Sequence, residues 1–380
     1  MRLVIGRLGG GAGAAIVALL FAACASPGIP PGGPVDTEAP KIVQIAPDSG
    51  KTGVTPKEVI FRFDEVVNER PSGVPALSGL FLISPRSGEP RVEWHRDEIS
   101  VRPRRGWRPN TAYTITLLPG LSDLRGNTRN TGAVTLFSTG PTIPAGRITG
   151  TFFNWAEGRA LPRALIEARP RADTTIVYVA SADSAGRFII ATLAPGPYLV
   201  RGLADDNSNK GLDPREAWDT VGVTVSDSAH ADIYGFVHDS LGSRIAGVSI
   251  RDSVTIEITF DGPLALAPLP GVANVRVRAN DSTDVPVISV APPAQDTAAT
   301  GAVKLGRPIP ARSLVVKLGR PLRPRTDYRV RVTDVRNLIG VVKSSDRPLS
   351  VPATPAALIT PGLLTPPPPP PPPPPPALRR

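Results

Sequence analysis

The chain has few of the residues on which most enzyme sites depend. Its 380 residues include one cysteine, three histidines and only 5% aromatic residues. A single cysteine excludes an internal disulfide, and His95, His230 and His238 lie in separate segments without the spacing of metal ligands. The serines do not occur in a G-x-S-x-G nucleophile elbow. We therefore expect a protein that is not an enzyme and that is stabilised by burial of apolar surface.

Helical periodicity is also missing from the chain after its N-terminal segment. The sequence instead has 46 prolines, 36 glycines and frequent short runs of Val, Ile and Thr. Such runs, separated by turn residues, predict an all-β fold with many connecting turns. The length favours two or three domains.

The formal net charge of +10 comes mainly from arginines that are scattered along the chain. The largest groups are Arg102, Arg104, Arg105, Arg108, Arg320, Arg323, Arg325, Arg329 and Arg331. They are not interleaved with aromatic residues, so nucleic acid is not an expected partner. We interpret them as solvated strand faces, with attraction to anionic envelope polymers or lipid headgroups as the alternative.

Residues 1–23 have the three parts of a secretory signal peptide. Arg2 and Arg7 form a positive n-region, and an uncharged apolar run ends in the small residues Ala22 and Ala23. The run falls short of the ~20 residues that span a bilayer. Cleavage before Cys24 is therefore expected, and an ordinary signal with an incidental cysteine is the alternative.

The cleavage site resembles the lipobox of bacterial lipoproteins, in which two small residues precede a cysteine. Here these are Ala22, Ala23 and Cys24, although Phe21 stands where the family usually has Leu. The resemblance implies acylation of Cys24, and two or three acyl chains anchor a protein stably. No Asp follows Cys24, which resembles the class sorted to the outer membrane. We expect a cell-envelope, outer-membrane lipoprotein with its membrane contact through Cys24, in either leaflet.

Residues 24–37 form a Pro/Gly tether, and residues 38–141 have the strand and turn spacing of one β-sandwich. Five short segments occur here in order: APDSG, VIFRFDEVV, RPNTAYTITL, LSDLRGNT and TLFSTG. They resemble the bacterial Ig-like domain of the S-layer (SbsA) type. The resemblance implies an Ig-like sandwich that serves as a spacer or adhesive module.

Residues 144–236 form a second β-rich unit. It contains the turn Asp183-Ser184-Ala185-Gly186-Arg187-Phe188 and the segment Leu193-Ala194-Pro195-Gly196-Pro197-Tyr198. These match the D-x-x-G-x-F and L-x-P-G-x-Y patterns of the carboxypeptidase regulatory-like (transthyretin-like) β-sandwich, which the unit resembles. The resemblance implies no catalysis.

Residues 237–352 are interpreted as a diverged second copy of the first domain. The strand before Asp261 parallels the one before Asp64, and the segment leading to Tyr328 parallels the one leading to Tyr113. Residues 353–380 form a Pro-rich tail with eleven consecutive prolines, which we expect to be disordered. A ligand for a proline-binding module or a stem that penetrates the cell wall is the alternative for this tail.

The segment 205–216 has the spacing of a calcium loop. Counted from Asp205, oxygen-bearing side chains fall where an EF-hand loop places its ligands, and Gly211 supplies the backbone carbonyl. The candidate ligands are Asp205, Asn207, Asn209, Gly211, Asp213 and Glu216. Lys210 stands where the EF-hand turn uses Gly, and no flanking helices are predicted. The alternative is an Asx-turn loop whose side chains bond to their own backbone.

Two further sets of residues are interpreted as structural. The pair Asp64-Glu65 ends a strand and is treated as a feature of the fold. The tryptophans could bind sugar if they were exposed and coplanar, but packing in the core or at its rim is the favoured interpretation. They are Trp94, Trp107, Trp155 and Trp218.

Together these features predict a non-enzymatic, membrane-anchored envelope lipoprotein that displays β-sandwich modules in a structural, adhesive or interaction role. Two alternatives stay open. The modules could bind envelope glycans or anionic polymers, or the chain could be an accessory subunit of a hydrolase or a secretion complex. Calcium is the only cofactor that the sequence suggests.

Overall fold

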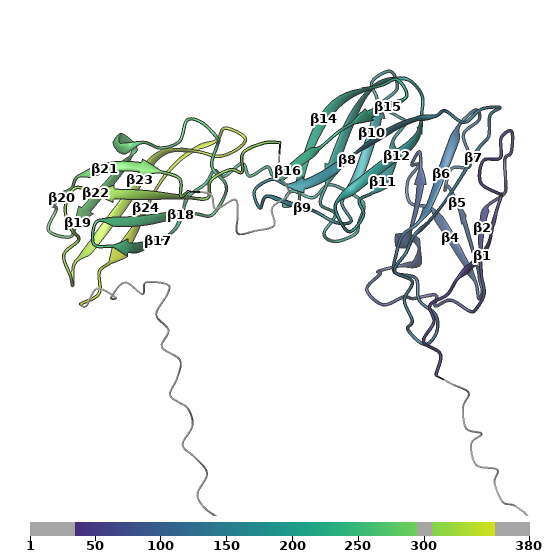
Figure 1. Cartoon of the computed structure of the whole chain (residues 1–380), viewed down its shortest axis with the longest axis horizontal. Helices are drawn as coiled ribbons and strands as arrows, with labels where there is room; N and C mark the ends of the chain where they lie inside the picture. The colour runs from purple at the N-terminus through teal and green to yellow at the C-terminus, as the bar shows by residue number, and fades with distance from the viewer. Residues whose placement is uncertain (1–34, 295–305, 354–380) are drawn as a thin grey trace, which may run out of the picture.

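The computed structural model describes residues 35–294 and 306–353 (Figure 1). Within these ranges the regular structure consists of β-strands and two short 3₁₀ turns, η1 (Leu77–Leu80) and η2 (Val272–Asn274). The all-β prediction is confirmed. Among the residues that the structure describes, no helix has the length and apolar character of a membrane span.

Several predictions fall on residues outside these ranges. The signal segment 1–23, Cys24, the tether up to residue 34 and the tail from residue 354 all lie outside the described residues.

Module 1, defined as strands β1 to β7, is a sandwich of two antiparallel sheets. One sheet has the order β1-β2-β5-β4 and the other β3-β6-β7. The strands are β1 (Ile42–Ala46), β2 (Val59–Phe63), β3 (Phe81–Ser84), β4 (Arg91–His95), β5 (Glu98–Arg102), β6 (Ala112–Leu117) and β7 (Ala133–Ser138).

The core of module 1 follows from the alternation of its strands. In β2, Val59, Phe61 and Phe63 are buried, whereas Arg62 between them is exposed. The inward residues meet Ile115 and Phe137 of the opposite sheet. Each such buried side chain contributes about 1.5–3 kcal/mol to stability.

Module 2, defined as strands β8 to β16, is built around a path of seven paired strands. Their order is β11-β10-β13-β14-β16-β8-β12, and β9 and β15 also pair with β8. The strands are β8 (Gly146–Asn154), β9 (Arg159–Ala160), β10 (Leu165–Pro170), β11 (Tyr178–Ser181), β12 (Arg187–Leu193), β13 (Gly196–Leu203), β14 (Ala217–Val225), β15 (Ser228–His230) and β16 (Ile233–Val237).

Phe152 occupies the centre of module 2 and explains two glycines in neighbouring strands. A Cβ on Gly202 would lie 2.3 Å from the Phe152 ring, and a Cβ on Gly235 would lie 2.4 Å from it. Both distances are shorter than carbon atoms can approach, so these strands can close over the ring only with glycine at these positions.

Module 3, defined as strands β17 to β24, has two four-stranded sheets with the orders β17-β18-β22-β21 and β20-β19-β23-β24. The strands are β17 (Ile245–Asp252), β18 (Thr255–Phe260), β19 (Val275–Ala279), β20 (Asp284–Val285), β21 (Val287–Ala291), β22 (Ser313–Leu318), β23 (Asp327–Arg336) and β24 (Val342–Ser350). Apart from the two-residue β20, this order repeats that of module 1 strand by strand.

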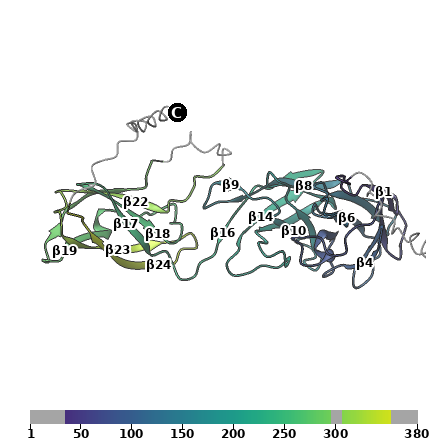
Figure 2. The ribbon, with the colours of Figure 1, turned by 90° about the horizontal axis from the view of Figure 1, so that it is seen from below.

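The two sandwiches also share a hydrogen bond at the strand that follows their long loop. In module 1 the Arg108 N–H donates to the hydroxyl of Tyr113 at 2.7 Å, and in module 3 the Arg323 N–H donates to the hydroxyl of Tyr328 at 2.8 Å. The three modules follow one another in chain order along the long axis of the molecule, as both Figure 1 and Figure 2 show.

Candidate functional site

The predicted calcium loop lies between β13 and β14, and its polar side chains bond to one another and to the loop backbone. The Asp205 carboxylate accepts the Lys210 N–H at 3.1 Å. The side-chain amides of Asn207 and Asn209 both donate to Oδ2 of Asp213, at 2.6 and 2.9 Å. These are the bonds of an Asx-turn network.

The remaining candidate ligands of this loop are engaged in the same way. The Gly211 N–H donates to Oδ1 of Asn209 at 2.6 Å. The carboxylate of Glu216, which is 4% exposed, accepts the N–H groups of Asp206 and Asp213 at 3.2 and 3.0 Å. Calcium in this loop stays a prediction, and binding the ion would require several of these bonds to open.

Lys210 departs from the calcium-loop pattern and has a different partner. Its backbone is left-handed with φ of 57°, the conformation that glycine would supply at this turn. Its ammonium group reaches across to module 1, where it donates to the carbonyl oxygens of Ser78 at 3.1 Å and Phe81 at 3.0 Å. Burial lowers the pKa of Lys210, and the charges of Glu89 and Asp205 oppose this shift.

A buried carboxylate completes the junction between modules 1 and 2. Glu167 in β10 is 1% exposed, and its Oε1 accepts from Arg86 of module 1 at 2.8 Å. Its Oε2 accepts from Arg201 at 2.6 Å and from Arg169 at 3.1 Å. Burial alone would raise the pKa of Glu167, but the guanidinium groups of Arg201 and Arg86 outweigh it and hold the pKa below the usual range.

Backbone and apolar contacts surround this ionic network. The Arg86 N–H donates to the carbonyl of Val177 at 2.7 Å, and the Val179 N–H donates to the hydroxyl of Ser84 at 2.9 Å. An apolar cluster shared by the two modules lies beside these bonds, and its buried members are Leu82, Leu165, Val179 and Leu203. Opening the junction would remove one of the three guanidinium partners of Glu167 and would take from the Lys210 ammonium its two carbonyl acceptors, so it would cost free energy.

The signal for Glu167 in the sequence was a single acidic residue in the apolar segment Leu165-Ile166-Glu167-Ala168. This residue can be recognised as a buried charge only when the positions of its three arginine partners are known. Arg86 is 81 positions away from Glu167, so sequence spacing does not connect them.

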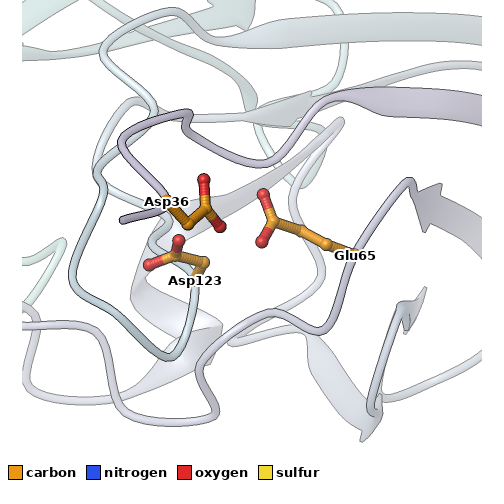
Figure 3. A group of neighbouring side chains, drawn as sticks. All are labelled: Asp36, Glu65 and Asp123. Atoms are coloured by element: carbon orange, nitrogen blue, oxygen red, sulfur yellow. The ribbon is translucent and has the colours of Figure 1, made fainter. Parts of the chain in front are cut away.

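A second cluster of carboxylates lies at the far end of module 1, and it includes one member of the pair Asp64-Glu65. Side-chain oxygens of Asp36, Glu65 and Asp123 lie within 4.8 Å of one another (Figure 3). Asp64 is turned elsewhere and accepts the Lys41 N–H at 2.7 Å. This is the one group of three or more potential metal-binding acidic, histidine or cysteine side chains among the residues that the structure describes.

The three carboxylates differ in their surroundings. Asp123 is buried, and although burial opposes its ionisation, hydrogen bonds from Asn127, Gly126 and Arg125 lower its pKa. Glu65 has a raised pKa because of its own desolvation and then because of the charges of Asp123 and Asp36. Carboxylate oxygens are ligands for hard cations, but the oxygens of Asp123 already accept bonds from Asn127 and Arg125 at 2.7–2.9 Å. The direct effect of the cluster is therefore repulsion on Glu65.

Three of the four tryptophans donate their indole N–H groups to backbone carbonyls within the fold. The N–H of Trp94 donates to Val67 O at 2.9 Å and that of Trp107 donates to Pro56 O at 2.6 Å. The N–H of Trp155 donates to Pro308 O at 2.9 Å, beside the Arg307 guanidinium that lies over the Trp155 ring. Trp218 stacks on His238 with their ring centroids 3.9 Å apart. These contacts agree with packing roles for the four rings.

Comparison with known proteins identifies one module. Residues 36–139 match the model of the family described as bacterial Ig-like domain. The predicted Ig-like domain is therefore confirmed in this region. No curated protein matches the chain.

Solved structures resemble the chain only weakly. They include the N-terminal part of the bacterial S-layer protein SbsC, at 16% identity and a TM-score of 0.22 over 29% of this chain and 24% of that one. The Bacillus anthracis TIE protein matches at 11% identity and a TM-score of 0.18 over 85% and 56%. The major pilin SpaD of Corynebacterium diphtheriae matches at 12% identity and a TM-score of 0.22 over 54% and 65%. The chain spans less than two thirds of each of these proteins. At such TM-scores the similarity does not indicate a shared function.

Proposed function

We propose that this protein is a non-enzymatic lipoprotein of the cell envelope, in which a row of β-sandwich modules acts as a spacer that displays its outer end away from the membrane. Three features support the proposal: the lipobox-like sequence at Cys24, the bacterial Ig-like domain at residues 36–139 and the row of sandwiches that follows it. The outer membrane is the proposed location.

The observation that most directly supports a spacer role is the junction between modules 1 and 2. A flexible linker would let adjacent modules reorient independently. Here the Arg86–Glu167 ion pair and the ammonium of Lys210 cross from one sandwich to the other, and Arg169 and Arg201 of module 2 hold the buried Glu167 carboxylate in place. A stalk needs a fixed angle between its modules. A set of binding domains that move independently does not need one.

We also propose that module 2 is a carboxypeptidase regulatory-like sandwich. In its D-x-x-G-x-F turn, the Asp183 carboxylate accepts the N–H groups of Ala185 and Arg187 at 2.8 and 2.9 Å, and Gly186 has a φ of 76°. The motif thus has a structural role, because the aspartate caps the turn and only glycine takes that φ without strain.

The anchor is tested with a Cys24→Ser variant of the full chain, with Ser26→Ala as the matched control. We expect wild type and the control to incorporate labelled fatty acid and to fractionate with membranes, and the Cys24→Ser variant to do neither. Retention of the unlabelled variant in the membrane fraction would contradict lipid anchoring at this residue. Protease treatment of intact cells then distinguishes the two leaflets.

A further inference from the structure

A large cleft lies where modules 1 and 2 meet. Its volume is about 1020 Å³. Module 1 contributes residues of the β2–β3, β3–β4 and β5–β6 connections, and module 2 contributes residues of the β10–β11 and β13–β14 connections. Arg86 and Lys210, which bond across the junction described above, are part of this lining, so both modules shape the cleft.

The side chains that line this cleft are strongly unbalanced in charge. Its basic residues are Arg86, Arg104, Arg105, Arg108 and Lys210, and its one acidic residue is Glu89. Two of the cations are committed to the junction, since Arg86 pairs with Glu167 and Lys210 donates to module 1 carbonyls. The positive charge that remains available comes from the β5–β6 loop.

In that loop Arg104, Arg105 and Arg108 are all exposed. Among the described residues, no carboxylate oxygen lies within 4.0 Å, the limit for an ion pair, of a guanidinium nitrogen of these three arginines. The nearby Asp173, whose charge interacts with that of Arg108, is itself bonded to the hydroxyl and the N–H of Thr175 at 2.6 and 2.9 Å. By contrast, Arg102 just before this loop is paired with Glu93 at 3.0 Å.

The backbone that carries these arginines is held firmly. The Gly106 N–H closes a turn on Pro103 O at 3.3 Å, and the Arg108 N–H donates to the Tyr113 hydroxyl at 2.7 Å. The Arg108 carbonyl accepts from the hydroxyl of Thr139 at 2.7 Å. A preorganised backbone lowers the ordering cost of binding, which then falls mainly on the three side chains.

The neutral lining of the cleft indicates the rest of the ligand. Ser87 and Ser208 present hydroxyl groups. The Thr175 hydroxyl and the Asn209 amide also line the cleft, but they already bond to Asp173 and Asp213. The single aromatic lining residue, Trp107, packs edge-on against Tyr113 and Phe137 and so does not offer a broad apolar platform. Guanidinium groups beside serine hydroxyls suit a ligand that is rich in hydroxyls and carries carboxylates.

We propose that the cleft between modules 1 and 2 binds an acidic polysaccharide, with Arg104, Arg105 and Arg108 bonding to its carboxylates. This assignment goes beyond the spacer role and does not depend on lipid anchoring. The guanidinium groups would form charge-assisted hydrogen bonds with the uronate carboxylates, and the hydroxyl groups of Ser87 and Ser208 would bond to the sugar hydroxyls.

The test is calorimetric titration of the purified full chain with oligogalacturonate, at low and at raised salt. The fully methyl-esterified oligomer is the control ligand, since it keeps the sugar backbone without the charge. The cleft variant is Arg104→Gln/Arg105→Gln/Arg108→Gln. The control variant is Arg70→Gln/Arg163→Gln/Arg331→Gln, which removes the same charge from exposed arginines outside the cleft.

We expect binding of oligogalacturonate that weakens with salt, no binding of the ester, and at least about a tenfold loss of affinity in the cleft variant alone. Equal losses in the two variants would overturn the proposal, because they would indicate attraction to net charge only. Binding of polyglutamate as tight as that of oligogalacturonate would overturn the assignment to a polysaccharide. Unchanged far-UV circular dichroism of both variants excludes misfolding as the cause of a loss.

Discussion

Modules 1 and 3 share one framework but differ in charge at the same loop. In both, an aspartate after the second strand accepts an N–H from the residue that precedes the first strand: Asp64 from Lys41 and Asp261 from Arg244, each at 2.7 Å. Isolated bridges then join Val67 to Asp123 in module 1 and Leu264 to Asn337 in module 3. Asp123 and Asn337 therefore occupy equivalent positions.

The hydrogen bonds at these two positions explain what the fold requires there. Oδ1 of Asp123 accepts the Asn127 N–H at 2.8 Å, and Oδ1 of Asn337 accepts the Val341 N–H at 2.9 Å. Both side chains are buried. The framework needs a side-chain oxygen to close this loop, whereas the negative charge is a property of module 1 alone.

The partners of the two side chains differ in one respect. The Asn337 amide donates to the carbonyl of Asp239 at 2.6 Å. In module 1 the corresponding donor is Asn127, whose amide bonds to both Asp36 O and Asp123 Oδ2, at 3.1 and 2.7 Å. Module 1 also has Glu65 where module 3 has Gly262, and among the described residues of module 3 the carboxylate cluster has no counterpart.

Removal of the buried oxygen should have the largest effect. We expect Asp123→Ala to destabilise module 1 by about 3 kcal/mol and Asn337→Ala to destabilise module 3 by about 2 kcal/mol, because each leaves buried N–H groups without an acceptor. Hydrogen exchange of the β6 and β23 peptides in the full chain measures the two losses separately. Equal protection in variant and wild type would contradict a structural role for the oxygen.

Exchange of the two residues should be asymmetric. Asn337→Asp replaces the donor to Asp239 O by a second acceptor, and we expect it to cost about 2 kcal/mol. Asp123→Asn keeps one acceptor and turns the other oxygen into a donor that faces the Asn127 amide. Because Asn127 is only half-buried and can turn its amide, we expect a smaller cost of about 1 kcal/mol.

The pH dependence sharpens this second comparison. Because the pKa of Asp123 is lowered in the folded protein, its ionised form stabilises module 1 above the ordinary aspartate range, and that contribution is lost as pH falls through the folded pKa. The gap between wild type and Asp123→Asn should therefore close in acid. The same hydrogen-exchange assay, repeated across pH, reports it, and a gap that widened in acid would have the wrong sign.

The smallest effect should come from Glu65, and it should be a gain. The raised pKa of Glu65 in the folded state means that its ionisation destabilises module 1, an effect that is absent in acid and grows as pH rises through the ordinary glutamate range. We expect Glu65→Gln to stabilise module 1 by a few tenths of a kcal/mol at neutral pH. Glu58→Gln, at a half-buried position of the same module outside the cluster, is the control and should show no gain. Loss of stability in Glu65→Gln would indicate that the carboxylate makes an attractive contact instead.

The strands of module 1 could be predicted because their information is local. The alternation of Val59, Phe61 and Phe63 around Arg62 defines a half-buried strand by itself. The same holds for Tyr328, Val330 and Val332 in module 3, where buried and exposed residues alternate along β23.

The sites were harder to predict because their partners are distant in sequence. Lys210 was visible only as a misfit in a calcium loop, and its contacts to Ser78 and Phe81 lie 132 and 129 positions away. Glu65 and Asp123 come together only when the two sheets of module 1 pack. Local motifs thus specify turns and strands, whereas buried charge networks depend on the angle between modules, which no local pattern encodes.

The junction at Glu167 has a mechanical consequence. Two sandwiches joined by a free linker would transmit a pull but no torque, and the mean reach of their far end would grow only slowly with chain length. Because Arg86 and Lys210 bond across the junction, we expect modules 1 and 2 to move as one rigid body. A sideways load on module 2 is then carried into the first sandwich, and the height of the outer end is set by the dimensions of folded modules instead of by chain entropy.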